Sequence, residues 1–132
     1  RTAKADDGML HNVTGDMNTI MAGLACGEPC TIGWEILRSC ADWFVSMPDW
    51  VAAHGMRVLG APLGEDPRVI SGESGASTTG LVSALCSRPE FADLRERLGL
   101  DETAQVLCIS TEGDTDRENY RRIVWNGAYP MP

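Results

Sequence analysis

The sequence predicts an α/β fold organised around a buried strand of a mostly parallel sheet. The first observation is a run of four apolar residues at 106–109, which is typical of a strand buried on both faces. The second is that a helix-like run, Arg117–Val124, follows this strand. Ligands in such sheets bind at the carboxyl ends of the strands, so Ser110 is a candidate binding residue.

The net charge and the lengths of the apolar runs argue against two classes of partner, nucleic acids and membranes. The chain has 132 residues, enough for one domain, and a formal net charge of −8. Nucleic-acid-binding proteins usually carry a basic stripe, so this charge argues against a nucleic-acid partner. No apolar run is long enough to span a membrane, so we expect no membrane partner. The first residue is Arg1 rather than Met, which suggests a piece of a longer protein.

The five cysteines predict no metal site. They form no C-x-x-C pair, and no histidine stands at the spacing of a zinc ligand. We expect small buried side chains, the usual state of free cysteine, with Cys108 in the core. Their odd number and the lack of a signal peptide favour a reducing cytoplasm. The cysteines are Cys26, Cys30, Cys40, Cys86 and Cys108.

Three further helices are expected from apolar periodicity and stop signals. Residues 31–44 carry apolar side chains at helical spacing, behind a threonine that can cap the helix. A short second helix covers residues 49–54, with Gly55 as its stop. A third covers residues 90–98 and closes at Gly99.

The aromatic and imidazole side chains are expected to be structural. Tryptophans in an acidic chain are better explained as packing anchors than as a platform for stacking bases. A histidine near a helix end most often caps the helix or is solvated. The residues concerned are Trp34, Trp43, Trp50, His11 and His54.

A second candidate segment lies at residues 71–76. It leads into a helix whose small residues Ala76, Gly80 and Ala84 are four apart, and this spacing leaves one face nearly flat, able to pack on a sheet or a planar ring. The glycines do not form G-x-G-x-x-G, so the dinucleotide fingerprint is absent. The helix amino terminus could still favour an anion. The acids at 112, 114 and 116 favour turn and cap roles over Ca²⁺, because the rest of an EF-hand loop is missing.

A third candidate lies at residues 20–25, which are small and apolar around Gly23. This stretch is either a tight turn in the core or a place where backbone approaches a flat ligand, since glycine lacks a Cβ.

Together these segments resemble the catalytic domain of fold-type II pyridoxal 5'-phosphate (PLP) enzymes, a group that includes the tryptophan synthase β subunit and the threonine and serine dehydratases. Within the group, the sequence resembles the diaminopropionate ammonia-lyase family from about residue 6 to the end. The matching stretches are DGMLH at 7–11, GDM at 15–17, TIMAGLACGEP at 19–29, SGESGA at 71–76 and STEGDTD at 110–116. The resemblance implies a three-layer fold with a mostly parallel sheet flanked by helices.

The resemblance implies PLP as the cofactor and gives five residues a cofactor-binding role. Ser110 is implied to hydrogen-bond the pyridine nitrogen, and Glu73 to be the acid close to the ring. The backbone at Ala22 and Gly23 is implied to lie beside the ring face, with Thr111 as a further neighbour.

The implied reaction is the α,β-elimination of 2,3-diaminopropionate, an amino-acid substrate, to pyruvate and ammonia. PLP supplies the electron sink and the protein supplies orientation and electrostatics. A neutral hydroxyl at Ser110 leaves the ring nitrogen largely unprotonated, which favours elimination at Cβ. The family also implies a homodimer.

The chain lacks the lysine motif and the glycine-rich phosphate cup of the family. Its single lysine, Lys4, stands in what looks like a frayed amino terminus. PLP enzymes bind the aldehyde of the cofactor through a lysine. We therefore expect residues 1–132 to be the carboxyl-terminal portion of the large PLP-binding domain, with no catalytic residue in it and no activity alone.

Two alternatives remain open from the sequence. One keeps PLP and changes the reaction, as in an enzyme similar to threonine synthase or to a serine or threonine dehydratase. The other is a non-catalytic binding domain that retains the shape of a cofactor site.

Overall fold

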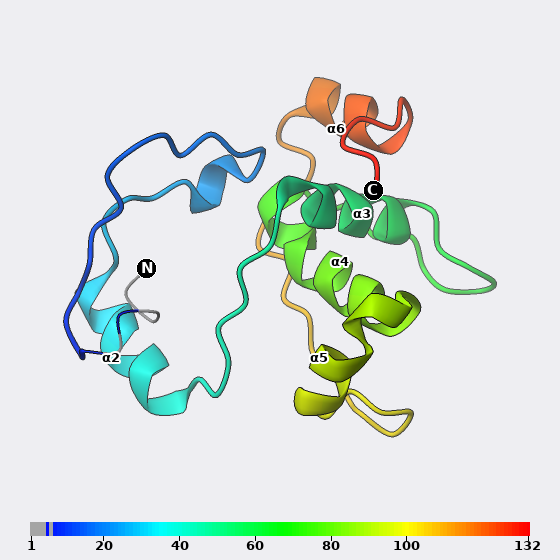
Figure 1. Cartoon of the computed structure of the whole chain (residues 1–132). Coiled ribbons are helices and arrows are strands. Elements are labelled where there is room, and N and C mark those ends of the chain that lie inside the picture. The colour runs from blue at the N-terminus through cyan, green and yellow to red at the C-terminus, as the bar shows by residue number, and fades with distance from the viewer. Residues whose placement is uncertain (1–4, 6) are drawn as a thin grey trace. The chain divides into compact units, whose positions relative to one another are not determined.

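The computed structural model of the chain describes residue 5 and residues 7–132 and divides into two compact units, Arg1–Ser46 and Met47–Pro132 (Figure 1). Lys4, which the sequence singled out as the only lysine, lies outside the described residues.

The first unit contains a short 3-10 turn, η1 (Ala22–Leu24), and the helix α2 (Thr31–Cys40). The helix begins where predicted, but its cap is the Sγ of Cys30, which accepts a hydrogen bond from the Gly33 N–H at 3.4 Å. The predicted continuation to residue 44 is wrong, because the backbone turns extended at Ala41. Phe44 instead packs its ring against Trp34, with centroids 6.0 Å apart. No residue of α2 is buried.

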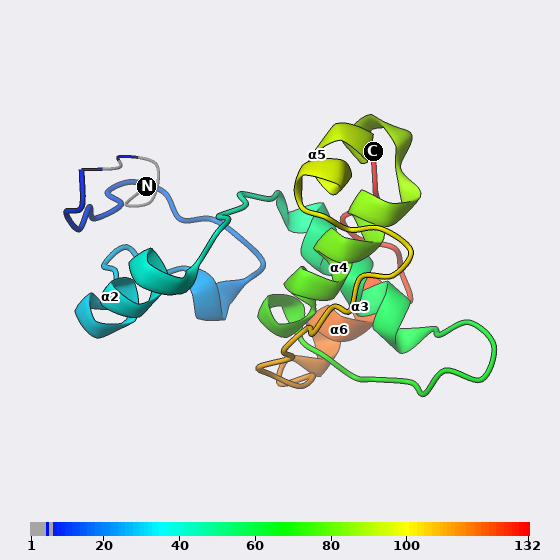
Figure 2. The ribbon, with the colours of Figure 1, turned by 90° about the horizontal axis from the view of Figure 1, so that it is seen from below.

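The second unit is built from helices. Figures 1 and 2 show α3 against α4, and α6 against the other side of α3, in agreement with the contacts between these elements. The elements are α3 (Asp49–Gly60), α4 (Glu73–Ser87), η2 (Pro89–Phe91), α5 (Ala92–Arg97) and α6 (Arg117–Val124). Among the described residues, no helix is both long and apolar enough to cross a bilayer.

The helices α3 and α4 cross in backbone contact. A Cβ built on Gly55 would lie 2.0 Å from the Ala76 carbonyl oxygen, and one built on Gly80 would lie 1.9 Å from the Val51 carbonyl oxygen. The flat face predicted for α4 is therefore used to pack on another helix. The predicted stop at Gly55 is wrong, since α3 continues through this residue to Gly60. The core of the crossing consists of Val51, Ala52, Met56, Ala76, Ala84 and Leu85.

A second set of contacts holds α6 and the last residues against α3. The side chain of Ile123 on α6 is fully buried. The Arg57 guanidinium on α3 donates to the carbonyl oxygens of Ile123 and Ala128, both at 3.0 Å, and to that of Tyr129 at 2.8 Å. Burial lowers the pKa of Arg57 from its ordinary value. One side chain thus satisfies three backbone acceptors around the end of α6.

Two helix ends follow the sequence prediction. α6 has the predicted bounds, and the Asp116 carboxylate caps it by accepting from the Asn119 N–H at 2.9 Å. Gly99 closes the α5 turn with φ of +67°, a conformation that glycine adopts readily. The Leu100 N–H there donates to the Arg95 carbonyl oxygen at 3.1 Å.

The predicted strand at 106–109 is not observed as part of a sheet. The part of the chain that the structure describes contains no strand. Leu107 is 85% exposed and Ile109 is 65% exposed. A strand buried on both faces needs a neighbouring strand and covering helices, and the described residues supply neither here. The three-layer sheet therefore stays a prediction.

The cysteines also differ from expectation. Cys108 is only half-buried rather than part of the core, and the other four are exposed. Cys108 is not in the core because the segment 106–109 that carries it is not covered by other elements, as the exposure of Leu107 and Ile109 shows.

Candidate functional site

The two candidate segments of the second unit meet. Residues 71–75 lead into α4, and residues 110–113 lie directly beside them. The Gly72 N–H donates to the Glu112 carbonyl oxygen at 3.1 Å. Stretches that are about 40 residues apart in sequence, and that the resemblance placed at one cofactor, therefore form a single site.

The centre of this site is a pair of serine hydroxyls. The Oγ atoms of Ser71 and Ser110 are 2.7 Å apart. Ser71 is 0% exposed, whereas Ser110 is exposed. The Ser110 hydroxyl is thus held by a buried partner on one side and is accessible on the other. The sequence identified Ser110 but gave no signal for Ser71 as its partner.

Gly75 makes room for this pair. A Cβ at Gly75 would lie 2.7 Å from Ser71 Oγ, 2.9 Å from Ser110 Oγ and 3.1 Å from the backbone nitrogen of Thr111. Real Cβ atoms do not come so close to polar atoms, so any side chain here would displace the hydroxyls. Thr111, the less certain of the predicted neighbours, is exposed beside the pair.

The amino terminus of α4 binds a carboxylate from the same chain, that of Glu112. The Glu112 side chain accepts from the Ser74 N–H at 2.6 Å and from the Gly75 N–H at 3.4 Å. A carboxylate there satisfies helix N–H groups and the helix dipole together. The cap role predicted for the acids at 112 and 116 is confirmed. That Glu112 caps a helix far away in sequence was not predicted.

Glu73, the predicted acid near the ring, links α4 to α6. Its carboxylate accepts a hydrogen bond from the side-chain amide of Asn119. The other end of that amide accepts from Arg122 Nε at 3.0 Å. Asn119 was not singled out from the sequence, because an asparagine inside a helix carries no motif of its own.

A buried hydroxyl at the head of α4 has no partner. The Oγ of Ser74 is inaccessible and makes no hydrogen bond among the described residues. Buried hydroxyls are normally paired, so this one has capacity for a further contact.

Ala22 and Gly23 lie in η1, in the first unit. Both are exposed. The turn is closed by the Leu24 N–H, which donates to the Met21 carbonyl oxygen at 2.8 Å. The expected tight turn in the core is wrong, because Ala22–Leu24 are exposed. The alternative, a close approach of this backbone to a flat ligand, stays a prediction.

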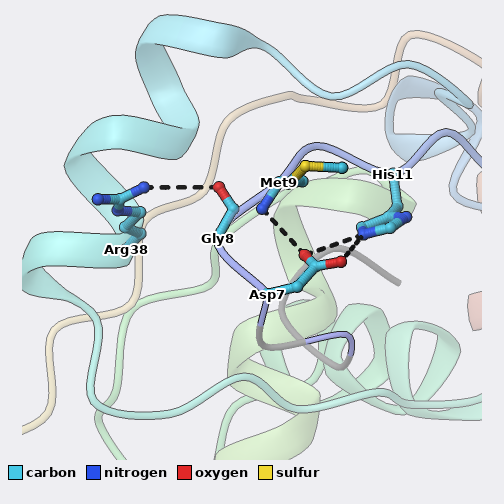
Figure 3. Close-up of polar contacts among 5 residues, drawn as sticks. All are labelled: Asp7, Gly8, Met9, His11 and Arg38. Carbon is cyan, nitrogen blue, oxygen red and sulfur yellow. Dashed lines mark hydrogen bonds and ion pairs between the residues drawn. The ribbon is translucent and has the colours of Figure 1, made fainter.

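The first unit also contains a polar cluster, at the DGMLH stretch (Figure 3). The Asp7 carboxylate accepts from the Met9 N–H at 2.9 Å and lies 2.8 Å from His11 Nε2. The Arg38 side chain on α2 donates to the Gly8 carbonyl oxygen at 3.5 Å. The Met9 N–H, and then His11, lower the pKa of Asp7. The contacts of Asp7 with Met9 and His11 span two and four residues, which agrees with a structural role for His11, whereas the Arg38 contact ties this turn to α2.

His54 differs from its prediction. It lies within α3 rather than near a helix end, is half-buried, and its Nε2 is 2.9 Å from the Ser83 hydroxyl of α4. Burial, reinforced by the positive charges of Arg57 and Arg88, lowers the pKa of His54. His54 therefore joins two helices, and its lowered pKa favours the neutral ring.

A hollow elsewhere in the second unit does not contain the predicted site residues. A hollow of about 730 Å³ beside α5 is lined by residues between Cys86 and Glu102, and none of the predicted site residues is among them. Within the described residues, no group of three His, Cys, Asp or Glu side chains could hold a metal ion.

Comparison with known proteins gives one consistent result. No family model matches the chain. The chain is 59% identical over 124 residues to diaminopropionate ammonia-lyase of Escherichia coli K12, which covers 94% of this chain and 31% of that relative. It is 54% identical over 128 residues to the enzyme of the same name from Salmonella typhimurium LT2, covering 96% of this chain and 32% of the relative.

Solved structures agree with the sequence relatives. The E. coli enzyme in complex with an aminoacrylate-PLP azomethine reaction intermediate aligns with a TM-score of 0.81 and 59% identity, over 84% of this chain and 29% of that chain. The same enzyme in complex with D-serine aligns with a TM-score of 0.79 and 57% identity, over 82% and 28%. The chain spans about a third of the length of the curated relatives. The resemblance that the motifs indicated is therefore confirmed: nearly all of this chain is similar, in sequence and in fold, to one part of diaminopropionate ammonia-lyase.

Proposed function

We propose that this chain is part of a PLP-dependent ammonia-lyase that converts 2,3-diaminopropionate to pyruvate and ammonia. The observation that carries the proposal is the 59% identity, with a TM-score of 0.81, to an enzyme of that name whose structure contains a PLP reaction intermediate. The serine pair at the head of α4 supports it from this chain's own residues.

The residues present fit the pyridine end of PLP. The ring nitrogen needs one hydrogen-bond donor, and the exposed hydroxyl of Ser110 offers one. The missing side chain at Gly75 lets the Ser110 hydroxyl keep this position, because a Cβ there would lie 2.9 Å from its Oγ. In the proposal, Glu73 stands close to the ring, Thr111 lies next to Ser110, and the backbone of Ala22 and Gly23 lies along the ring face.

When bound, PLP supplies the electron sink for loss of the α-proton and of the β-amino group. The residues of this chain bind and orient it. Ser110 hydrogen-bonds the ring nitrogen without supplying a charge, since a hydroxyl is neutral at physiological pH. Glu112 fixes the end of α4, so that Gly75 and the serine pair keep their places. Asn119 holds the carboxylate of Glu73 in one position.

The proposal extends to the fold and assembly of the whole enzyme. Residues 1–132 form the carboxyl-terminal portion of a large PLP-binding domain of fold-type II. Residues 106–109 become a strand of its mostly parallel sheet, and the lysine that holds the cofactor precedes this portion. The enzyme is a homodimer in the cytoplasm. Five free cysteines, four of them exposed, fit a reducing compartment.

The test is borohydride reduction in the presence of PLP, on this chain and on the intact polypeptide, followed by peptide mass mapping. Stoichiometric label on a lysine outside residues 1–132 is the expected result. The reaction is identified by the rate of ammonia and 2-oxo-acid release from 2,3-diaminopropionate. The same rate is measured in separate assays with serine and with threonine.

Other outcomes would contradict the proposal. Faster turnover of serine or threonine would favour a dehydratase-like enzyme. Stoichiometric label on Lys4 would show that the cofactor lysine had been misplaced. Absence of label from the intact polypeptide would favour a non-catalytic binding domain.

A further inference from the structure

Ser71 has the environment of a hydrogen-bond donor with one good acceptor. Its side chain is fully buried, so water cannot accept its proton. Three oxygens lie within reach of its Oγ: Ser110 Oγ at 2.7 Å, the Gly72 carbonyl oxygen at 3.3 Å and the Glu112 carbonyl oxygen at 3.4 Å. Hydrogen bonds between oxygens are normally about 2.7–2.8 Å long. The contact with Ser110 is the only one of the three with that length.

The direction of this bond decides what Ser110 can do. If Ser110 donated to Ser71, its single proton would be used inside the protein, and Ser110 could not donate to a ligand. If Ser71 donates to Ser110, the proton of Ser110 stays available. The other internal acceptor for that proton is the Glu112 carbonyl oxygen at 3.3 Å, a long and weak contact.

The contact between Ser71 and Ser110 depends on the absence of a side chain at Gly75. Both hydroxyls would be within 3.0 Å of a Cβ at that position, at 2.7 Å and 2.9 Å. A glycine at the first turn of α4 therefore lets the helix come close enough for Ser71 and Ser110 to meet.

We infer that Ser71 is a positioning residue for the cofactor contact: its buried hydroxyl donates to Ser110 Oγ and so directs the proton of Ser110 outward, toward the ring nitrogen of PLP. The inference rests on the proposed function, because it needs a ring nitrogen as the final acceptor. It assigns to Ser71 an effect exerted only through Ser110. The two hydroxyls form a short neutral chain, in which each donor also strengthens the next.

The experiment is a double-mutant cycle in the holoenzyme, with Ser71→Ala, Ser110→Ala and the double variant. The readouts are the absorption spectrum of bound PLP and its dissociation constant, neither of which requires turnover. Ser71→Ala should weaken PLP binding by about three- to tenfold, the effect of losing one neutral hydrogen bond. It should also shift the PLP spectrum in the same direction as Ser110→Ala. In the double variant, removing Ser71 should add no further loss of PLP affinity.

Two variants separate this role from a structural one. Ser77→Ala removes another buried hydroxyl of α4, one that donates to the Ser74 carbonyl oxygen at 2.7 Å. It should lower the thermal midpoint and leave the PLP spectrum unchanged. Ser71→Cys keeps a donor, although a weaker one on a larger sulfur atom, and should fall between wild type and Ser71→Ala, even if the alanine variant folds poorly.

The outcomes are distinguishable. A wild-type enzyme that binds no PLP would overturn the proposed function. A wild type that binds PLP and responds to Ser110→Ala, but whose spectrum is unmoved by Ser71→Ala, would overturn the inference alone. So would losses of affinity that add fully in the double variant.

Discussion

Gly55 and Gly80 face each other in backbone contact where α3 crosses α4. A Cβ on Gly55 would lie 2.7 Å from the Gly80 nitrogen, and one on Gly80 would lie 2.9 Å from the Gly55 nitrogen. The candidate site lies at the start of α4. The close approach of α3 and α4 fixes where α4 lies, and this helps to hold the serine pair in position.

Replacement of Gly80 by alanine should be strongly destabilising. The added methyl would lie 1.9 Å from the Val51 carbonyl oxygen, so the helices must separate. We expect the free energy of unfolding to fall by about 3 kcal/mol, at the upper end of ordinary overpacking. Urea unfolding monitored by circular dichroism measures it. Gly113→Ala is the matched control, since a Cβ there meets nothing within 4 Å; an equal loss in both variants would contradict the prediction.

Removal of the Glu112 charge should weaken the start of α4. Glu112→Gln keeps an acceptor for the Ser74 N–H but loses the charge that faces the helix dipole. The expected loss of stability is about 1 kcal/mol, and Glu112→Ala should lose more, because it leaves helix N–H groups without this acceptor. Denaturant unfolding of both variants tests the order. Glu65→Gln, at an exposed position in the loop after α3, should have no measurable effect.

Loss of the Arg57 guanidinium should release the last residues of the chain. Arg57→Met keeps much of the apolar stem but leaves three carbonyl oxygens, on Ile123, Ala128 and Tyr129, without this donor. A loss of about 2–3 kcal/mol is expected for hydrogen bonds from a charged group. Amide exchange gives the location: the Ala128 N–H, bonded to the Arg122 carbonyl oxygen at 3.1 Å, should exchange faster, while the amides of α4 do not change. Uniform acceleration would argue against a local role.

His54 should make the protein less stable in mild acid. Burial, with Arg57 and Arg88 nearby, lowers the pKa of His54 below its ordinary value of 6.5. The unfolded chain therefore binds a proton at higher pH than the folded one, and stability falls as the pH drops from 6.5 toward the pKa of the folded state. His54→Gln should reduce the loss of stability between about pH 7.5 and about pH 5.5. A titration midpoint of the His54 ring at or above 6.5, measured by NMR, would contradict this assignment.

The parts of the fold that follow local rules could be predicted from the sequence. α6 begins at an aspartate that caps it, and α5 closes at a glycine with positive φ; both signals act over a few residues. The predicted helix end at Gly55 is wrong, because the sequence does not distinguish a glycine that ends a helix from one that lets a second helix pack closely. The difference depends on Gly80, which lies 25 residues away in α4.

The candidate site could be predicted only in part for the same reason. Ser110 follows an apolar run, and this position is a local signal. Ser71 as its partner, Glu112 as the cap of α4 and Asn119 as the partner of Glu73 each join positions that are 38–46 residues apart. Such pairings depend on how segments far apart in the sequence pack together, which no local pattern of residues encodes.

The exposed apolar segment 106–109 should promote self-association when the 132-residue chain is handled alone. Exposed apolar segments of high β-propensity can pair with strands of other molecules, and Leu107 and Ile109 are 85% and 65% exposed. Short stretches of high β-propensity without charge are also those that stack into cross-β fibrils. Solubility, more than the stability of the helices, should therefore limit the concentration at which the 132-residue chain can be handled alone.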